Sequence, residues 1–313
     1  MTLSPYVRIV AQGKGRARAL TQIEAHDAMS LILSGKAAPE AIGALLMVLR
    51  LRGETDAEIA GFTSALRVTT KATTAADLDW PCYAAGRTRG APLFLLSAKL
   101  VSMAGYEVAM HGWNSHQNTT ADPRAALRAL DLIGDGLNYV PLEELNPQAF
   151  ELLKLRDIFG LRSCINTVLR MWNPSGARAS VQGVFHPSYR GLQSRAATLL
   201  GDQNLTVIKG GGGEFERNPA KDIQVFGLRD GIELNETAPA LFSVHRRASD
   251  PTHSIDIADI WLGAQVDPFS TDTIIGTAAL ALWTVGAAPD IKRSTDMASD
   301  LWSNRWTETR KSA

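Results

Sequence analysis

The sequence predicts an α/β fold preceded by a small all-helical unit. The first 70 or so residues contain three successive helix patterns, whereas the remainder alternates short apolar strands with helices. Such alternation is typical of a sheet covered by helices. With 313 residues, of which 45% are hydrophobic, the chain has enough material for one large domain or two ordinary ones.

Three stretches predict the helices of the first unit. Thr21-Gln-Ile-Glu24 and Thr55-Asp-Ala-Glu58 are capping boxes, in which the threonine oxygen accepts a helix N–H and the glutamate returns to the threonine backbone. Between them, a helix with Pro39 in its first turn carries apolar residues at the spacing of an amphipathic helix. We therefore expect a bundle of at least three helices.

Short apolar runs and glycines mark the elements of the second part. A helix is expected over 92–104, closed by Gly105, and a strand precedes the glycine run at 210–213. Two runs joined through Arg229-Asp230-Gly231 indicate a hairpin. The other expected elements are strands over 107–110, 205–208, 223–226 and 231–234, and helices over 271–285 and 289–306.

Composition excludes several classes of protein. No apolar stretch reaches the roughly 20 residues of a membrane span, and the N-terminal residues lack the apolar core of a signal peptide. We therefore expect a cytoplasmic protein without a membrane partner. Cys82 and Cys164 fit neither a disulfide framework nor a metal-binding spacing, so both are expected to be reduced and buried.

Charge is balanced over the whole chain but not along it. Lys plus Arg equals Asp plus Glu at 32 each, which argues against a globally basic nucleic-acid-binding protein. The intervals from Asp79 to Glu107 and from Asp157 to Asp202, however, contain no acidic residue between their ends. These segments predict a local positive surface if the fold brings them together. The alternative is that their arginines are scattered, solvated positions.

Motifs in a fixed order carry a resemblance to a known family. They are the helical segment 20–67, "VAMHG" at 108–112, "LRDIFGLRSCINTVLRMWNP" at 155–174, "GVFHPSY" at 183–189 and the closing stretch 257–283. Together they resemble the anthranilate phosphoribosyltransferase and pyrimidine nucleoside phosphorylase superfamily, glycosyltransferase family 3. The resemblance covers nearly the whole chain.

This resemblance implies two domains and a ligand cleft. Residues 1–75, completed by a returning segment near 150–175, would form the helical domain, and residues 76–149 and 176–313 an α/β domain with a central mixed sheet. The family binds phosphoribosyl pyrophosphate with magnesium between the domains and is usually a homodimer. We therefore expect a homodimer, with magnesium as cofactor if the chain is an enzyme; no cofactor is otherwise implied.

The donor-side motifs are altered in this sequence. Where the family has a Gly-Thr-Gly-Gly-Asp loop and a Phe-Asn-x-Ser-Thr helix start, only Gly86 and Ser97 match, and Arg87 and Arg89 appear as added charges. The family's Lys-His-Gly-Asn keeps its His111, which is either an acid–base group or a packed histidine. The paired magnesium carboxylates correspond to Glu214 and Glu216, which are not adjacent.

Other positions are candidates for holding phosphate or an acceptor. Lys209, with Gly210 and Gly211 after it, predicts either a backbone anion site or merely a tight turn. The resemblance aligns Arg156 with an arginine that contacts anthranilate, although pairing with Asp157 is an alternative role. The expected acceptor or polyanion residues are Arg156, Arg162, Arg170 and Asn166.

Two functions and a third alternative follow. An altered donor loop with added arginines resembles a divergent TrpD-like branch, which implies binding of a phosphate-bearing polyanion, most plausibly nucleic acid, in a basic interdomain cleft. The alternative is an active pentosyl- or phosphoribosyltransferase that takes a phosphorylated small molecule and magnesium. A third hypothesis is a scaffold for protein partners, with Trp302 and Trp306 as an exposed anchor.

Overall fold

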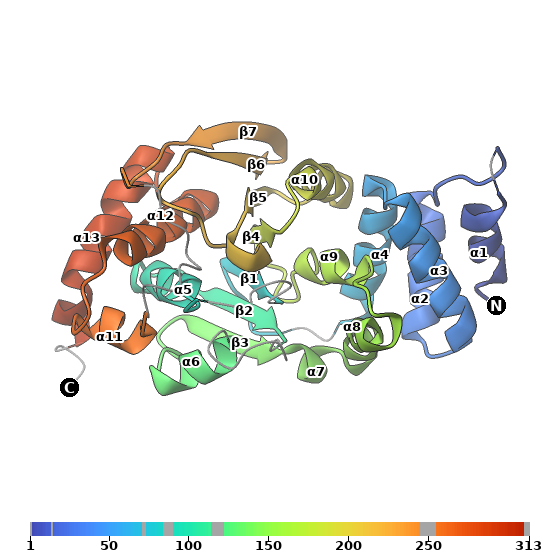
Figure 1. Ribbon diagram of the computed structural model, residues 1–313, viewed down its shortest axis with the longest axis horizontal. Coiled ribbons are helices and arrows are strands. Elements are labelled where there is room, and N and C mark those ends of the chain that lie inside the picture. The colour runs from blue at the N-terminus through green and yellow to red at the C-terminus, as the bar shows by residue number, and fades with distance from the viewer. Residues whose placement is uncertain are drawn as a thin grey trace.

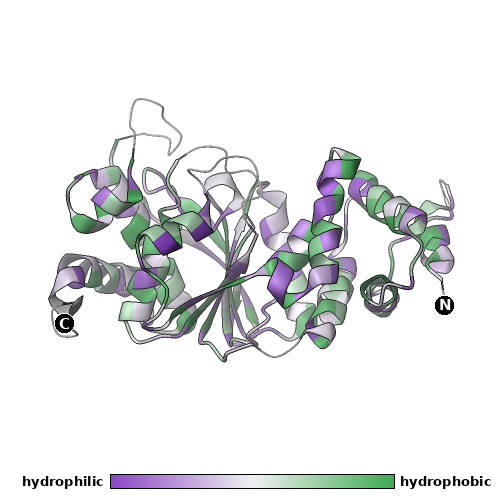
Figure 2. Cartoon of the chain, turned by 90° about the horizontal axis from the view of Figure 1, so that it is seen from below, coloured by the Kyte–Doolittle hydropathy of each residue, from purple (hydrophilic) through white to green (hydrophobic). Residues whose placement is uncertain are grey.

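The computed structural model describes residues 2–13, 15–70, 73–83, 90–113, 122–244 and 255–309. The N-terminal helices lie at one end of an elongated molecule, and a sheet flanked by helices forms the other (Figure 1). Figure 2, seen at 90° to that view, shows the same separation along the long axis, with hydrophilic and hydrophobic residues mixed along the N-terminal helices. These helices are α1 (Ser4–Ala11), α2 (Gln22–Leu33), α3 (Pro39–Arg52) and α4 (Asp56–Thr69).

Both predicted capping boxes are confirmed. The Thr21 and Thr55 hydroxyl oxygens accept the N–H groups of Glu24 and Glu58, at 3.2 and 3.3 Å. Each glutamate accepts the backbone N–H of its threonine in return, at 2.9 Å in both boxes. The helix starts are therefore fixed by four residues each, as their sequences imply.

One mixed sheet of seven strands organises the second part of the chain, as predicted. The strand order is β3-β2-β1-β4-β5-β6-β7, in which the first five strands are parallel and the last two antiparallel to their neighbours. The predicted hairpin is confirmed as β6 and β7. The strands are β1 (Leu78–Cys82), β2 (Val108–Gly112), β3 (Leu137–Pro141), β4 (Ala179–Val184), β5 (Asn204–Lys209), β6 (Ile223–Arg229) and β7 (Ile232–Ala238).

Helices cover both faces of the sheet, which explains why its parallel strands are largely apolar. One face carries α5 and α12 with α13 outside them, and the other carries α10, which also packs on α4 (Figure 1). The helices of this part are α5 (Phe94–Met103), α6 (Pro123–Ala129), α7 (Leu142–Leu145), α8 (Pro147–Phe159), α9 (Ile165–Arg170), α10 (Ser188–Leu200), α11 (Ile257–Leu262), α12 (Pro268–Val285) and α13 (Ile291–Thr309).

The segment after α8 returns to the N-terminal helices. α9 packs on α4, and Arg67 of α4 donates hydrogen bonds to the carbonyl oxygens of Met171 and Trp172, at 2.7 and 3.0 Å. One apolar cluster joins residues of α2, α3 and α4 to α8, α9 and α10. The domain boundaries stay a prediction, but this packing fixes the position of α9 beside the end of β4.

Other expectations concern the cysteines, the C-terminal tryptophans and membrane insertion. Cys82 and Cys164 are free and buried, as predicted. The Arg305 guanidinium lies over the rings of Trp302 and Trp306, at 3.8 and 3.9 Å, so both tryptophans have an intramolecular partner. Within the described ranges, no helix is long and apolar enough to span a bilayer.

Candidate functional site

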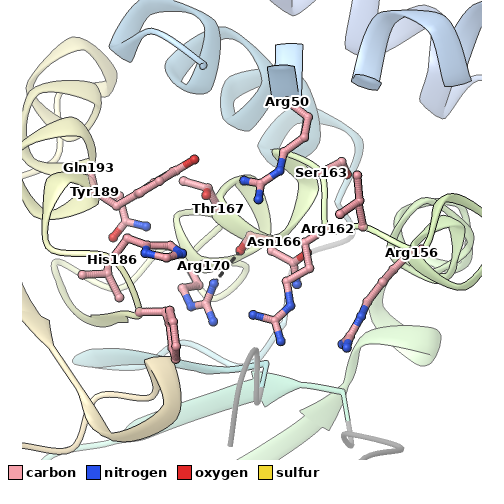
Figure 3. Close-up of a pocket in the computed structure, with 14 residues that line it drawn as sticks. Arg50, Arg156, Arg162, Ser163, Asn166, Thr167, Arg170, His186, Tyr189 and Gln193 are labelled. Carbon is pink, nitrogen blue, oxygen red and sulfur yellow. Dashed lines mark hydrogen bonds between the residues drawn. The ribbon is translucent and has the colours of Figure 1, made fainter. Parts of the chain in front are cut away.

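A polar cavity of about 260 Å³ lies at the carboxyl end of β4. Three segments converge there: the last turn of α3, the stretch from α8 through α9, and the residues that lead from β4 into α10. Ligands of α/β proteins bind at the carboxyl ends of parallel strands, because strand ends and helix starts meet at this edge. We call this cavity the arginine pocket, after Arg50, Arg156, Arg162 and Arg170, which line it (Figure 3).

The positive charge of the arginine pocket is largely uncompensated. Arg50, Arg162 and Arg170 form no ion pair with any carboxylate in the part of the chain that the structure describes. Tyr189, which also lines the pocket, donates its hydroxyl to Glu54 at 2.9 Å. Three cations in one cavity form a strong anion site.

Arg170 lies deepest in the pocket. Its side chain is buried, and Nη1 donates to the carbonyl oxygen of Asn166 at 3.2 Å, whereas Nη2 has no hydrogen-bond partner among the described residues. Burial lowers the pKa of this guanidinium, and the charge of Glu214 opposes that shift. Because arginine keeps its charge even so, a buried unpartnered N–H is costly, and an anion would satisfy it.

Arg162 is half-buried between the other arginines. Burial first, and then the charges of Arg156, Arg170 and Arg50, lower its pKa to about 10. The close-up shows the guanidinium groups of Arg50, Arg162 and Arg170 directed toward a common space (Figure 3). Mutual repulsion of this kind is relieved when an anion binds between the charges.

Neutral polar groups and one aromatic side chain complete the pocket. Gln193 of α10 is 1% exposed, and no group in the described ranges donates to its Oε1, so it can accept an N–H or O–H from a ligand. Phe185 is 49% exposed at the mouth, with its ring 4.9 Å from that of His186. The pocket can therefore hold a small planar molecule that carries an anionic group.

The structure brings all four predicted acceptor residues into this one pocket. Arg156, Arg162, Arg170 and Asn166 each line it. Of the acid-free segment between Asp157 and Asp202, Arg162 and Arg170 thus share one positive surface, whereas Arg178 and Arg195 pair with Asp230 and Asp56 elsewhere. Sequence reasoning missed Arg50 and Gln193: Arg50 is far away in the chain, and nothing in its helix marks it as different from other basic residues near a helix end.

His111 lies in a buried polar chain under the pocket. Its Nδ1 is 2.8 Å from the Tyr83 hydroxyl, and its Nε2 is 3.1 Å from Oδ1 of Asp79, which in turn accepts the Ser180 hydroxyl at Oδ2. Burial raises the pKa of Tyr83 well above its usual value, so the phenol stays protonated. His111 is 1% exposed, which favours the packed role over that of an acid or base in contact with a ligand.

Two predicted donor-side groups are engaged inside the fold. The Ser97 hydroxyl donates to the carbonyl oxygen of Ile274 at 3.0 Å and is fully buried. At the start of α5, the N–H of Phe94 donates to Oε2 of Glu216 at 3.0 Å. A carboxylate of the protein itself thus occupies the end of the helix at which the resemblance implies a diphosphate.

The glycine run after β5 is explained by close packing. The N–H groups of Gly210 and Gly211 donate to Val184 and Glu216, at 3.1 and 2.9 Å. A Cβ at Gly210 would lie 1.6 Å from the Glu214 carbonyl oxygen, so only glycine fits there. Lys209 is exposed at the end of β5. The anion role of these residues stays a prediction, which the observed hydrogen bonds do not support.

Glu214 and Glu216 do not fit a magnesium site. Both are almost completely buried, Glu216 holds the start of α5, and Glu214 lies close enough to Arg170 to affect its pKa. Magnesium keeps several waters and needs open octahedral geometry. Among the described residues, no three metal-binding side chains come together. Gly86, Arg87 and Arg89 lie outside the residues that the structure describes.

Comparisons with known proteins agree with this architecture. The family model "Glycosyl transferase family, helical bundle domain" matches residues 5–69. The anthranilate phosphoribosyltransferase of Bacillus caldotenax is 32% identical over 240 residues, which span 71% of this chain and 96% of that protein. That of Geobacillus kaustophilus (strain HTA426) is 29% identical over 316 residues, or 93% of this chain and 91% of its own.

Solved structures show the same fold. Anthranilate phosphoribosyltransferase (TrpD) from Thermus thermophilus superposes with a TM-score of 0.75 at 21% identity, over 91% of this chain and 92% of that one. The Saccharomyces cerevisiae enzyme, solved in complex with PRPP and Mg, gives a TM-score of 0.73 at 15% identity, over 96% of this chain and 93% of that one. At these identities the structural match establishes the fold alone.

Proposed function

The chain belongs to the anthranilate phosphoribosyltransferase family, and from this premise we propose that it transfers a pentosyl or phosphoribosyl group to a small anionic acceptor. The relatives are named for such a transfer to anthranilate, a planar molecule with one carboxylate. The observation that carries the proposal is the arginine pocket, in which a buried Arg170 guanidinium has an unpartnered Nη2.

In this proposal the pocket binds and orients the acceptor. Arg170 and Arg162 hold its anionic group, because charge-assisted hydrogen bonds to guanidinium are strong and directional. The unpartnered Oε1 of Gln193 accepts an N–H or O–H of the acceptor and fixes which edge of the ring faces the donor. Since Glu214 and Glu216 do not fit a magnesium site, no step of the transfer is assigned to a metal.

The test combines donor binding with turnover. We expect calorimetry to detect binding of phosphoribosyl pyrophosphate to the protein. In a second assay, with anthranilate or another planar anion as acceptor, we expect pyrophosphate to be released only when the acceptor is present. Arg162→Gln should reduce that rate at least tenfold, since one charge-assisted hydrogen bond contributes roughly 1.5 to 3 kcal/mol. Arg293→Ala, at an exposed position of α13, is the control that leaves the rate unchanged.

A second candidate is binding of a phosphate-bearing polyanion, such as nucleic acid, without transfer. It is favoured by the engagement of Ser97 with Ile274 and of the α5 N-terminus with Glu216, because both groups are then withheld from a diphosphate. This candidate requires single-stranded DNA to bind at low salt with an affinity that falls steeply as salt rises. Absence of donor binding together with a steep salt dependence would replace the first proposal by the second.

A further inference from the structure

The number of charges in the arginine pocket exceeds what one carboxylate requires. A carboxylate carries a single charge, and one guanidinium satisfies its two oxygens in a bidentate pair. Arg50, Arg162 and Arg170 instead form no ion pair with a carboxylate in the described chain, and Arg156 lines the same cavity. A monocarboxylate ligand would therefore leave most of the pocket's positive charge uncompensated.

Two further features of the pocket suit an anion, namely a buried guanidinium and the start of a helix. Within the part of the chain that the structure describes, Nη2 of Arg170 has no hydrogen-bond partner, although only 6% of the residue is exposed. α10 begins at the same cavity through Tyr189, with no side-chain cap and no acidic residue in its first turn. The positive end of that helix dipole adds to the field of the arginines.

The pocket also limits the size of its ligand. The volume of the pocket, about 260 Å³, is slightly smaller than that of most small-molecule sites, roughly 300 to 1,000 Å³. The half-exposed Phe185 supplies an aromatic surface in its lining. This volume favours a small ligand with one ring over a long strand, of which only one unit would enter.

From these observations we infer that the arginine pocket binds a small phosphomonoester that carries a planar ring, with its dianionic phosphate held between Arg162, Arg170 and the start of α10. A phosphomonoester has close to two charges and three acceptor oxygens at neutral pH, which suits three cations that form no ion pair in the described chain. The inference names the ligand class of the proposed acceptor pocket and rests on that proposal for the pocket's role.

The test uses two probes with the same ring. Calorimetry of the full chain should show phenyl phosphate binding at least tenfold more tightly than benzoate, and inorganic phosphate should displace it. Arg162→Gln should weaken phenyl phosphate binding about 10- to 100-fold, as expected for one charge-assisted hydrogen bond, with a smaller effect on benzoate. Arg50→Gln, at an exposed position, should weaken it less. Arg293→Ala should leave both affinities unchanged.

Several results would overturn the inference. Benzoate that binds as tightly as phenyl phosphate would make the pocket a carboxylate site, and affinities unchanged in both variants would place phosphate elsewhere. If an oligonucleotide bound while phenyl phosphate neither bound nor competed with it, the arginines would bind a nucleic-acid strand rather than a small phosphomonoester. Because binding is measured without turnover, selective phosphate binding by a protein that does not catalyse transfer contradicts only the proposed function. Acceptor-dependent turnover on a monocarboxylate, unaffected by phenyl phosphate, contradicts only this inference.

Discussion

Two cavities of about 260 Å³ each lie at opposite ends of β4, and arginines line both. At the amino end of the strand, Arg67 pairs with Asp202 at 2.7 Å and Arg178 pairs with Asp230 at 2.9 Å. At the carboxyl end, Arg50, Arg162 and Arg170 have no such partner in the described chain. Arginines with partners stabilise the fold, whereas those without partners are available to a ligand. We call the first cavity the paired pocket.

The largest expected effect comes from the paired pocket. Arg67→Met removes four hydrogen bonds, two to Asp202 and one each to the carbonyl oxygens of Met171 and Trp172. Because these groups are mostly buried, we expect urea unfolding to show a loss of about 2 to 4 kcal/mol. Phenyl phosphate affinity of the folded protein should not change. If Arg67→Met kept its stability but no longer bound phenyl phosphate, the distinction between a stabilising paired pocket and a ligand-binding arginine pocket would be wrong.

A smaller effect should follow from giving the arginine pocket its own carboxylate. Gln193→Glu changes little volume and places a negative charge among unpaired arginines, so the free energy of unfolding should rise by about 1 to 2 kcal/mol while phosphate binding falls at least tenfold. The matched control is Gln203→Glu, which adds a carboxylate to the paired pocket and should change neither quantity. Destabilisation by Gln193→Glu would show that the arginines are less close to Gln193 than the pocket implies.

The next prediction concerns the repulsion between Arg162 and the other arginines of the pocket. Arg162 has a folded pKa of about 10, below its usual value, so its charge opposes folding at neutral pH and does so less as pH rises through 10. Because the side chain is partly solvated, we expect Arg162→Gln to stabilise the unliganded protein by no more than about 1 kcal/mol. Equilibrium unfolding at pH 7 measures this, and a loss of stability would mean that the side chain has a structural partner.

The smallest effect is expected at the rim of the paired pocket. Arg178 and Asp230 are 72% and 73% exposed, and exposed pairs contribute little because water and salt screen them. Asp230→Asn should therefore change the free energy of unfolding by less than about 0.5 kcal/mol. If Asp230→Asn lowered the free energy of unfolding as much as Arg67→Met does, burial could not explain why the Arg67–Asp202 pair contributes more than the Arg178–Asp230 pair.

Local signals in the sequence predicted the class of the fold, its N-terminal helices and part of the site, but not β1, β3 and β4. The capping boxes at Thr21 and Thr55 depend on four adjacent residues, so a pattern within one turn determined them. The motif at 155–174 likewise placed Arg156, Arg162 and Arg170 together, because they lie within 15 positions, on α8, on α9 and in the turn between these helices.

The rest of the site depends on distant contacts that no local pattern encodes. Arg50 reaches the pocket only because α3 packs near the returning segment, more than 100 residues later in the chain. Nor does the sequence reveal that Arg67 is paired and Arg162 is not, since pairing depends on which loop passes each guanidinium. Glu216 was expected to hold a metal, but its position at the start of α5 is set by the turn that packs Gly210 against Glu214.

The unpaired guanidinium of Arg170 also makes the stability of the folded protein depend on the concentration of its ligand. A ligand that binds only the folded state at 100 times its dissociation constant adds about 2.7 kcal/mol, which corresponds to a rise of roughly 5 °C in melting temperature for a chain of this size. Proteases and chaperones act on the unfolded fraction, which that free energy lowers about a hundredfold. The abundance of this protein in a cell would then follow the supply of the anion that fills its pocket.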